Sequence, residues 1–324
     1  MGSVRRFDVC NGDADGLCAV LQWRLHEPAS ATLVTGLKRD IALLQHVLPS
    51  QADEVLVCDL SLRRNLAALL ALLAGGARVH YFDHHVSGPV PQHERLTVHI
   101  DTAADLCTSL LMDRHLGGRH RAWALVGAYG DDLVAPADRL ARAIGLCDSQ
   151  RAELRRFGQA INYNAYGDDA TDTLITPADL YGVMSRHADP FSMLVCEPIV
   201  DELDTRRRAD LHLALALPPL REGPQGRLVL LPEAAWSRRV SGCLANVLAT
   251  ADPARAQAVL THRRGGGFGV SVRAPRATPG GASELCARFG GSGRAAAAGI
   301  DRLPPDQLER FISAFSAARW GAPV

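Results

Sequence analysis

Three short runs of strand-forming residues end in acidic or histidine side chains, and this pattern limits the fold more than any other feature. Residues 7–10 lead into Asn-Gly-Asp-Ala-Asp-Gly at 11–16, residues 55–58 lead into Asp59, and residues 79–82 lead into Asp83-His84-His85. Helix-forming stretches separate these runs, and strand-helix-strand order at this spacing predicts a parallel sheet with right-handed crossovers. Because the carboxyl ends of parallel strands line a common crevice, we expect the three clusters to meet there.

A crevice lined by these side chains would be strongly negative at neutral pH. Its expected members are Asp13, Asp15, Asp59, Asp83 and His84. Mixed carboxylate and imidazole ligands suit manganese, magnesium, iron or zinc, and two cations would balance the charge better than one. An aspartate at a strand-to-helix junction is also a common helix cap, so each acid taken singly has a purely structural interpretation.

Composition sets limits on partners and location. The 324 residues, 47% of them hydrophobic, are enough for two domains with real cores. Lysine plus arginine equals aspartate plus glutamate, 35 each, so we expect no long nucleic acid as a partner. The eight cysteines include no Cys-x-x-Cys pair, which is typical of reduced thiols in a cytoplasmic protein. The longest apolar run, Leu66–Gly76, is far short of the roughly 20 residues that span a bilayer, and residues 1–6 resemble no signal peptide, so no membrane partner is expected.

The expected fold is α/β in three parts: a parallel-sheet domain over residues 1–135, a helical connector over 136–222 and a smaller α/β domain over 223–324. Within the first part we expect a helix over Asp40–Val47, and an apolar run over 122–129 that ends in Gly130-Asp131-Asp132. In the last part a glycine-rich turn precedes Ala295–Ala298, which predicts a helix start presenting backbone N–H groups.

Five motifs in order resemble those of the DHH-family phosphoesterases with a DHH-associated C-terminal domain, the RecJ-like and nanoRNase superfamily. The resemblance covers essentially the whole chain. Its motifs are Asn-Gly-Asp-Ala-Asp-Gly at 11–16, Asp59 in Val-Cys-Asp-Leu-Ser, Asp83-His84-His85, Asp131 in Gly-Ala-Tyr-Gly-Asp-Asp, and residues 289–299, which are similar to the family's Gly-Gly-Gly-His-x-x-Ala-Ala-Gly signature.

The resemblance implies two divalent cations, manganese or else magnesium, that activate a bridging water for attack on phosphorus. Asp59 would bridge the two cations, with Asp13 on one and Asp15, His84 and Asp131 on the other. Asp132 stays open as an alternative to Asp131. His85 would point at the substrate phosphate, and Asp83 would orient His84, as ligand imidazoles usually require. The implied catalytic residues are Asp59, Asp83, His84 and His85.

The C-terminal domain would hold the nucleotide end of a short substrate. Its implied binding residues are Arg273, Gly290, Gly291, Gly293 and Arg294, which act together with His85. Arg294 stands where the family signature has histidine, and arginine can grip phosphate bidentately. A second departure lies in the first motif, where many family members have a histidine ligand and this chain has Val9, Cys10 and Asn11. Asn11 could coordinate weakly or hold a water.

The function that these residues predict is metal-dependent hydrolysis of phosphoester bonds in short oligonucleotides, dinucleotides or nucleotide phosphates. A pyrophosphatase or exopolyphosphatase is the alternative enzyme, since the same metals cleave phosphoanhydrides. A nucleotide sensor without catalysis is a third interpretation, supported by the departure at Asn11. The sequence leaves a homodimer open as a further association. Arg263 and Arg264, before three glycines, are most simply a solvated hairpin loop.

Overall fold

The structure, a computed structural model, describes residues 4–321 and divides them into two compact units. The first unit comprises residues 4–165 and 174–204, and the second comprises 166–173 and 205–321. The chain therefore passes between the units at 165–166, 173–174 and 204–205. Each unit has its own sheet.

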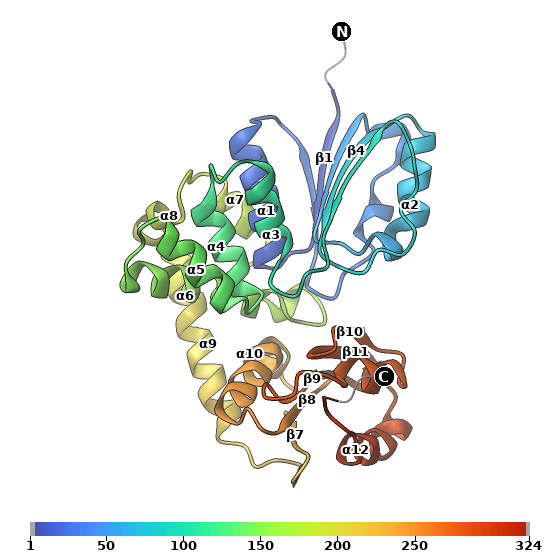
Figure 1. Cartoon of the computed structure of the whole chain (residues 1–324), viewed down its shortest axis with the longest axis vertical. Helices are drawn as coiled ribbons and strands as arrows, with labels where there is room; N and C mark the ends of the chain where they lie inside the picture. The colour runs from blue at the N-terminus through green and yellow to red at the C-terminus, as the bar shows by residue number, and fades with distance from the viewer. Residues whose placement is uncertain (1–3, 322–324) are drawn as a thin grey trace. The chain divides into compact units, whose positions relative to one another are not determined.

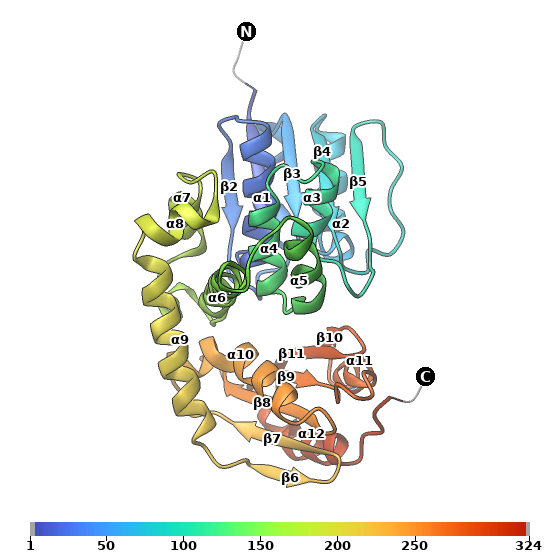
Figure 2. The ribbon, with the colours of Figure 1, turned by 60° about the vertical axis from the view of Figure 1, so that its left-hand side comes forward.

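The first unit is built on five parallel strands in the order β2-β1-β3-β4-β5 (Figures 1 and 2). The strands are β1 (Arg6–Cys10), β2 (Thr32–Thr35), β3 (Glu54–Cys58), β4 (Arg78–Asp83) and β5 (Leu96–Ile100). The strand order reverses between β1 and β3, and the carboxyl ends of strands at such a reversal form the usual ligand crevice of open α/β sheets. The expected parallel sheet is therefore confirmed.

Alternating side chains of the strands supply two cores, one on each face of this sheet. On β3, Val55 and Val57 pack in the core that includes α2 (Leu62–Ala74) and the 3₁₀ turn η1 (Leu43–His46). Leu56 and Cys58 face the other core, which α1 (Ala14–His26), α3 (Thr108–His115) and α4 (Arg121–Gly130) complete. Figure 1 shows α2 on one side of the sheet and α1 and α3 on the other. The sheet is thus buried on both faces, as parallel sheets require.

Further helices extend the first unit. They are α5 (Val134–Ala143), α6 (Asp148–Ala165), α7 (Pro177–Met184), α8 (Pro190–Cys196) and the start of α9 (Ile199–Leu215), with a short 3₁₀ turn η2 (Pro49–Gln51) near the sheet. Phe157 of α6 and Met184 of α7 are fully buried in the same core as α1. The three expected segments thus differ from the two units, because most of residues 136–204 pack within the first unit rather than forming a separate connector.

The second unit contains a six-stranded mixed sheet in the order β10-β11-β9-β8-β7-β6. Its elements are η3 (Ala170–Asp172), β6 (Arg221–Gly223), β7 (Gly226–Leu230), α10 (Ala235–Ala251), β8 (Ala256–His262), β9 (Phe268–Arg273), α11 (Ala282–Ala287), β10 (Ser292–Gly293), β11 (Ala297–Leu303), η4 (Pro305–Gln307) and α12 (Leu308–Ser316). Of the strand pairs in this sheet, β7 and β8 run parallel and the others antiparallel. Among residues 4–321 no helix is both long and apolar enough to cross a membrane.

Two local predictions are wrong. The helix expected over Asp40–Val47 is only the 3₁₀ turn η1. The alanine run at 295–298 does not begin a helix: the backbone N–H of Arg294 donates to the carbonyl of Ala297 at 2.8 Å, and Ala297 donates back at 3.2 Å. These bonds close a hairpin between β10 and β11, and β11 then pairs with β9. Sheet pairing outweighs the helix propensity of alanine here because propensity is a weak prior.

Candidate metal centre

Asp13 divides its two carboxylate oxygens between a helix cap and the centre of the site. It is the N-cap of α1, and its Oδ1 accepts the backbone N–H groups of Asp15 at 3.0 Å and Gly16 at 3.1 Å. Its Oδ2 pairs instead with the ammonium of Lys38. Burial by itself would raise the pKa of Asp13, but the charge and hydrogen bond of Lys38 outweigh it and lower that pKa. The capping and ligand interpretations of Asp13 are therefore compatible.

Asp15 is held in place by the first turn of α3. Its Oδ2 accepts the backbone N–H of Thr108 at 2.8 Å and its Oδ1 accepts that of Ser109 at 2.7 Å. The first N–H groups of a helix have no partner within the helix, and a carboxylate is favoured beside them. The side chain is 1% exposed, so its orientation is fixed by buried bonds.

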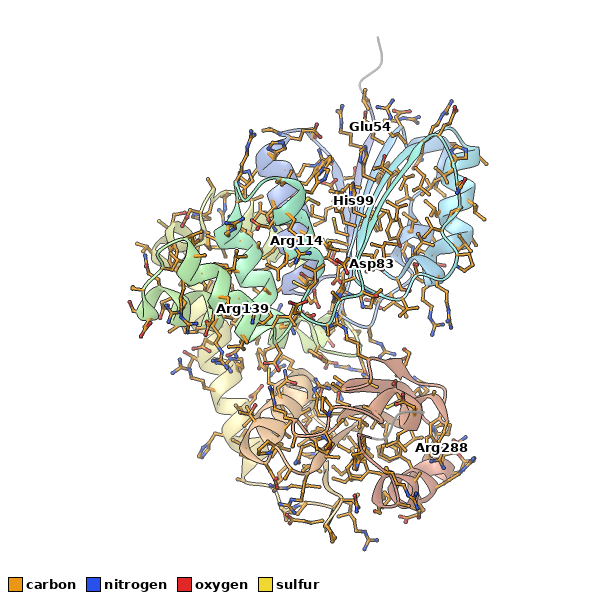
Figure 3. The ribbon with its side chains drawn as sticks, viewed as in Figure 1. Glu54, Asp83, His99, Arg114, Arg139 and Arg288 are labelled. Atoms are coloured by element: carbon orange, nitrogen blue, oxygen red, sulfur yellow. The ribbon has the colours of Figure 1, made fainter. Side chains whose placement is uncertain are left out.

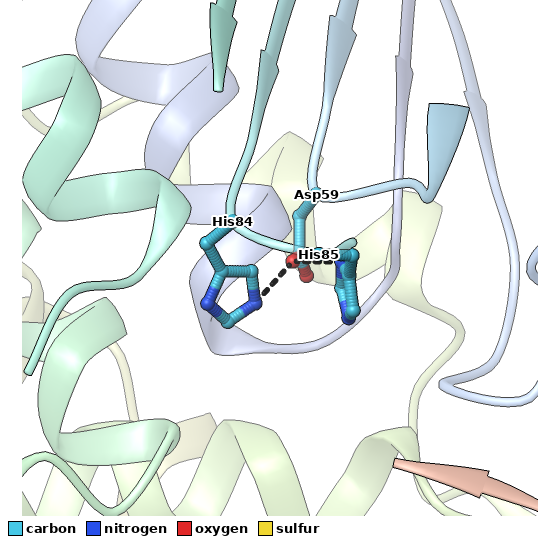
Figure 4. A group of neighbouring side chains, drawn as sticks. All are labelled: Asp59, His84 and His85. Carbon is cyan, nitrogen blue, oxygen red and sulfur yellow. Dashed lines mark ion pairs between the residues drawn. The ribbon is translucent and has the colours of Figure 1, made fainter. Parts of the chain in front are cut away.

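Asp59 adopts a left-handed backbone conformation, with φ of 58°, between β3 and α2. Its Oδ1 lies 3.2 Å from Nε2 of His84 and 3.9 Å from Nδ1 of His85 (Figure 4). Burial, followed by the nearby charges of Asp13 and Asp15, raises the pKa of Asp59 well above its usual range. A left-handed backbone at a non-glycine residue and crowded like charges both cost free energy, and such features cluster at functional sites.

His84 is oriented by the backbone. Its Nδ1 donates to the carbonyl of Leu106 at 3.2 Å, so its Nε2 faces Asp59 and lies 3.9 Å from Oδ2 of Asp15. Burial disfavours the charged imidazole, but the hydrogen bond to Asp59 and the charge of Asp131 raise the pKa of His84 to about 10. A cation bound at Nε2 would replace the proton there, since metal ligands must be deprotonated.

His85 pairs with Asp83. Its Nδ1 donates to Oδ1 of Asp83 at 2.7 Å, and its side chain is 47% exposed. Burial lowers the pKa of His85, but the hydrogen bond and charge of Asp83 outweigh it and raise that pKa. The prediction that Asp83 orients His84 is therefore wrong, because Leu106 holds His84 and Asp83 holds its neighbour. The second oxygen of Asp83, Oδ2, is buried with no hydrogen-bond partner among the described residues.

Asp131 and Asp132 were alternative metal ligands in the sequence analysis, and the structure gives them different surroundings. Asp131 follows the end of α4, and its Oδ1 is 3.8 Å from the ammonium of Lys38. Its charge also acts on His84, which places it at this centre. Asp132, the alternative, has a left-handed φ of 61°. Asp131 thus lies close to Lys38 and His84, and its role as a metal ligand stays a prediction.

Asn11 serves as a brace. Its Oδ1 accepts the backbone N–H of Asp13 at 3.2 Å, and its Nδ2 donates to the carbonyl of Lys38 at 3.1 Å. The amide thus ties together the two loops that carry Asp13 and Lys38. Asn11 thus makes a scaffolding contact, and its weak coordination or water-holding stays a prediction.

The donor set suits a divalent cation such as manganese. Ligand atoms of Asp59, His84 and His85 all lie within 4.8 Å of one another. Asp13 shares a side-chain hydrogen bond with Asp59, and Oδ2 of Asp15 lies 3.9 Å from Nε2 of His84, so both carboxylates adjoin the same cluster. Figure 3 shows that Asp83 lies toward the opposite end of the sheet from Glu54, at the start of β3. The five residues expected in the crevice follow the carboxyl ends of β1 and β3 or lie at that of β4: they are Asp13, Asp15, Asp59, Asp83 and His84.

Sequence reasoning missed three residues of this centre: Lys38, Thr108 and Ser109. Thr108 also donates its hydroxyl to Asp59 at 3.4 Å. Backbone donors carry no sequence signal. Lys38 did leave one, because it is the only lysine among 35 lysine and arginine residues.

The expected substrate-binding residues of the second unit lie at the end of β9, in the turn between α11 and β10, and on the β10–β11 hairpin. Ala297 of β11 pairs with Arg273 of β9, so the hairpin adjoins that arginine. The guanidinium of Arg273 donates to Oδ1 of Asn246 at 2.7 Å. Gly290 and Gly293 have positive φ values of 76° and 147°, which favour glycine. A Cβ on Gly291 would come within 2.3 Å of the carbonyl oxygen of Gly299, and Arg294 is exposed in the hairpin turn.

Arg263 and Arg264 are not simply solvated. Arg263 pairs with Asp168, and Arg264 pairs with Asp172 at 2.7 Å and Asp169 at 3.3 Å. Because residues 166–173 belong to the second unit, these pairs attach that segment to the β8–β9 hairpin. The arginines therefore have a structural role.

The chain is a two-unit α/β protein. Its first unit is a parallel sheet with a carboxylate and histidine centre at the β1–β3 reversal, and its second unit has a smaller mixed sheet. Solved structures identify it further. The chain is similar to the exonuclease RecJ bound to manganese, with a TM-score of 0.62 and 19% identity over 97% of this chain and 89% of that one. The chain is also similar to RecJ from Thermus thermophilus in complex with Mn²⁺, with a TM-score of 0.59 and 20% identity over 97% of this chain and 51% of that one.

The pGpG-specific phosphodiesterase PggH from Vibrio cholerae gives a TM-score of 0.51 at 15% identity, over 96% of this chain and 97% of that one. The chain therefore has a RecJ-like fold. No protein-family model and no curated protein sequence matches it.

Proposed function

We propose that this protein is a metal-dependent phosphoesterase that hydrolyses short oligonucleotides, dinucleotides or nucleotide phosphates. The observation that carries the proposal is the convergence of Asp13, Asp15, Asp59 and His84 at the strand-order reversal of the sheet. The same fold in a manganese-bound exonuclease and in a pGpG-specific phosphodiesterase supports it.

The proposed ligands are Asp13, Asp15, Asp59, His84 and Asp131. Bound divalent cations would supply activation of water and neutralisation of charge at phosphorus. The protein's own contribution is to fix the ligands: α3 holds Asp15 through two N–H groups, and the Leu106 carbonyl holds His84. Fixed ligands keep the centre in one geometry and spare it reorganisation during the reaction.

His85 is the proposed phosphate contact. Its Nδ1 proton is engaged by Asp83, so its Nε2 is the nitrogen left for the substrate. Because Asp83 raises the pKa of His85, the ring is more cationic than an isolated histidine at neutral pH. A half-exposed imidazolium can donate a charge-assisted hydrogen bond to a phosphate oxygen.

Substrate length follows from the charge of the chain. Equal numbers of acidic and basic residues leave the chain with no net positive charge, whereas long nucleic acids are held mainly by contacts of cations with many phosphates. We therefore propose small anions as substrates. The proposed binding residues of the second unit are Arg273, Gly290, Gly291, Gly293 and Arg294. Dinucleotides should turn over faster than a twenty-nucleotide strand.

The test is release of mononucleotide or phosphate from a fixed panel of compounds. The panel contains a linear diadenylate, a short RNA, a long single strand, phosphoadenosine phosphate and pyrophosphate, each assayed with Mn²⁺, Mg²⁺ or a chelator. Metal-dependent cleavage of the short phosphoesters is the expected result. Cleavage of pyrophosphate alone would instead identify a phosphoanhydride hydrolase, and absence of turnover with every metal would contradict the enzyme assignment.

A further inference from the structure

Lys38 is the one lysine in the sequence. Every other fixed cation is arginine, and the one lysine stands beside the proposed metal ligands. A lysine ammonium is a compact point charge on a flexible stem, whereas a guanidinium is a broad planar fork. An ammonium is thus the side-chain cation that most closely replaces a small metal ion.

The contacts of Lys38 are those of a bound cation. Oδ1 of Asp13 is committed to the α1 cap, so Oδ2 is the oxygen left for a metal, and the Lys38 ammonium occupies that oxygen. The same ammonium lies 3.8 Å from Oδ1 of Asp131. Lys38 therefore contacts two proposed ligands that belong to separate segments of the first unit.

The backbone of Lys38 is fixed by hydrogen bonds, whereas its side chain is partly exposed. Asn11 donates to the Lys38 carbonyl at 3.1 Å, and the Lys38 N–H donates to the carbonyl of Ala165 at 3.0 Å. The side chain is 27% exposed, in contrast to 3% for Asp13. A four-carbon stem anchored in this way can carry the ammonium away from Asp13 without a change in the fold.

We propose that Lys38 is an internal counter-ion of the centre, which holds Asp13 until a divalent cation displaces it. This inference rests on the proposed metal centre. In the metal-free protein the ammonium offsets part of the charge of the crowded carboxylates. When the cation binds Oδ2 of Asp13, Lys38 moves off that oxygen and remains at the rim as a tethered positive group for an anionic substrate.

The single lysine allows a direct test. The metal-free protein is treated with an amine-acetylating reagent, with and without Mn²⁺, and the modification at Lys38 is measured by mass spectrometry after cleavage at arginine. The α-amino group serves as the internal reference. We expect Mn²⁺ to accelerate the acetylation of Lys38 several-fold relative to that reference, because the ammonium leaves its pair with Asp13. An unchanged or slower rate would overturn the proposal.

Metal affinity gives an independent measurement. Equilibrium dialysis with Mn²⁺ alone should show that K38M binds Mn²⁺ about tenfold more tightly than the unmodified chain does. The reason is that Mn²⁺ no longer has to displace the ammonium from its charge-assisted contact with Asp13. K38R should keep the lower affinity because it keeps a competing cation. R95M is the matched control: Arg95 is an exposed cation that pairs with Glu94 and bonds to Gly76, and its removal should leave affinity unchanged.

The outcomes separate this proposal from the proposed function. If the unmodified chain binds Mn²⁺ and K38M binds it equally or more weakly while keeping its circular dichroism spectrum, the counter-ion role is wrong and the metal centre stands. If the unmodified chain and all three variants fail to bind Mn²⁺, the metal centre and the counter-ion role are both wrong.

Discussion

At Asp59 the backbone conformation and the side-chain charge can be separated by substitution. The residue has a positive φ, which asparagine tolerates better than other non-glycine residues. D59N should therefore keep the loop between β3 and α2 while it removes a proposed bridging ligand. We expect turnover of a dinucleotide to fall by more than about 100-fold, the upper range for loss of a residue that only supports a ligand.

The same substitution should stabilise the metal-free protein. Burial and the charges of Asp13 and Asp15 disfavour ionised Asp59, so its removal relieves an unfavourable interaction. Urea unfolding in chelator at pH 8 checks this. A D59N protein that is less stable than the unmodified chain under these conditions would show that Asp59 has a mainly structural role.

Asp83 offers a test of which histidine it supports. In D83N the amide oxygen can still accept from Nδ1 of His85, but the negative charge that favours the imidazolium is gone. We expect kcat to fall about 10- to 100-fold with Mn²⁺ affinity unchanged, since a supporting residue acts through its partner. H84Q is the comparison: it should weaken Mn²⁺ binding directly. Loss of Mn²⁺ affinity in D83N would return Asp83 to the role of orienting His84.

Among the elements, the β10–β11 hairpin depends on Gly293, whereas Gly290 lies in the turn between α11 and β10. A Cβ on Gly293 would lie 2.5 Å from Cα of Ala298, on the paired strand, whereas a Cβ on Gly290 would meet nothing within 4 Å. G293A should therefore disrupt the hairpin and raise KM for a dinucleotide. G290A should cost only about 1 kcal/mol of backbone strain. An unchanged KM in G293A would mean that the hairpin does not bind the substrate.

Sequence patterns predicted elements whose signal is local. The β1, β3 and β4 strands have apolar runs that end in acid, so their parallel pairing and the meeting of Asp13, Asp59 and His84 could be foreseen. The hairpin at Ala297 could not, because its pairing with β9 is made by residues distant in sequence. Lys38 and the Asp83–His85 pair were missed for a related reason: which side chain reaches which is decided by loop conformation.

For the whole molecule, the segment 166–173 is notable because it belongs to the second unit while both flanking segments belong to the first. Asp172 is fully buried in it and accepts two hydrogen bonds from Arg238 at 2.7 Å. Arg264 adds a third at 2.7 Å, and Arg239 donates to the Asp172 carbonyl. The carboxylate of Asp172 thus holds the segment 166–173 against α10 and the β8–β9 hairpin.

Removal of that carboxylate should destabilise the second unit. D172N leaves Arg238 without its buried partner, and breaking a buried pair in this way typically costs about 3–5 kcal/mol. Hydrogen exchange at the amides of β8 and β9 measures the loss in this unit specifically. D169N is the matched control, because Asp169 is exposed and its pair with Arg264 should contribute less than about 1 kcal/mol.

Acid should reveal the same carboxylate in the unmodified protein. Burial would raise the pKa of Asp172, but its bonds to Arg238, Asp168 and Arg264 outweigh it and hold that pKa well below its usual range. A group with a lowered folded-state pKa contributes stability above its unfolded value, near 4, and that stability is lost as the pH falls below it. Protection of β8 and β9 should therefore decline below about pH 4 in the unmodified chain and decline less in D172N. If protection declines equally with pH in both proteins, the acid sensitivity comes from other carboxylates and the charge of Asp172 does not stabilise the fold.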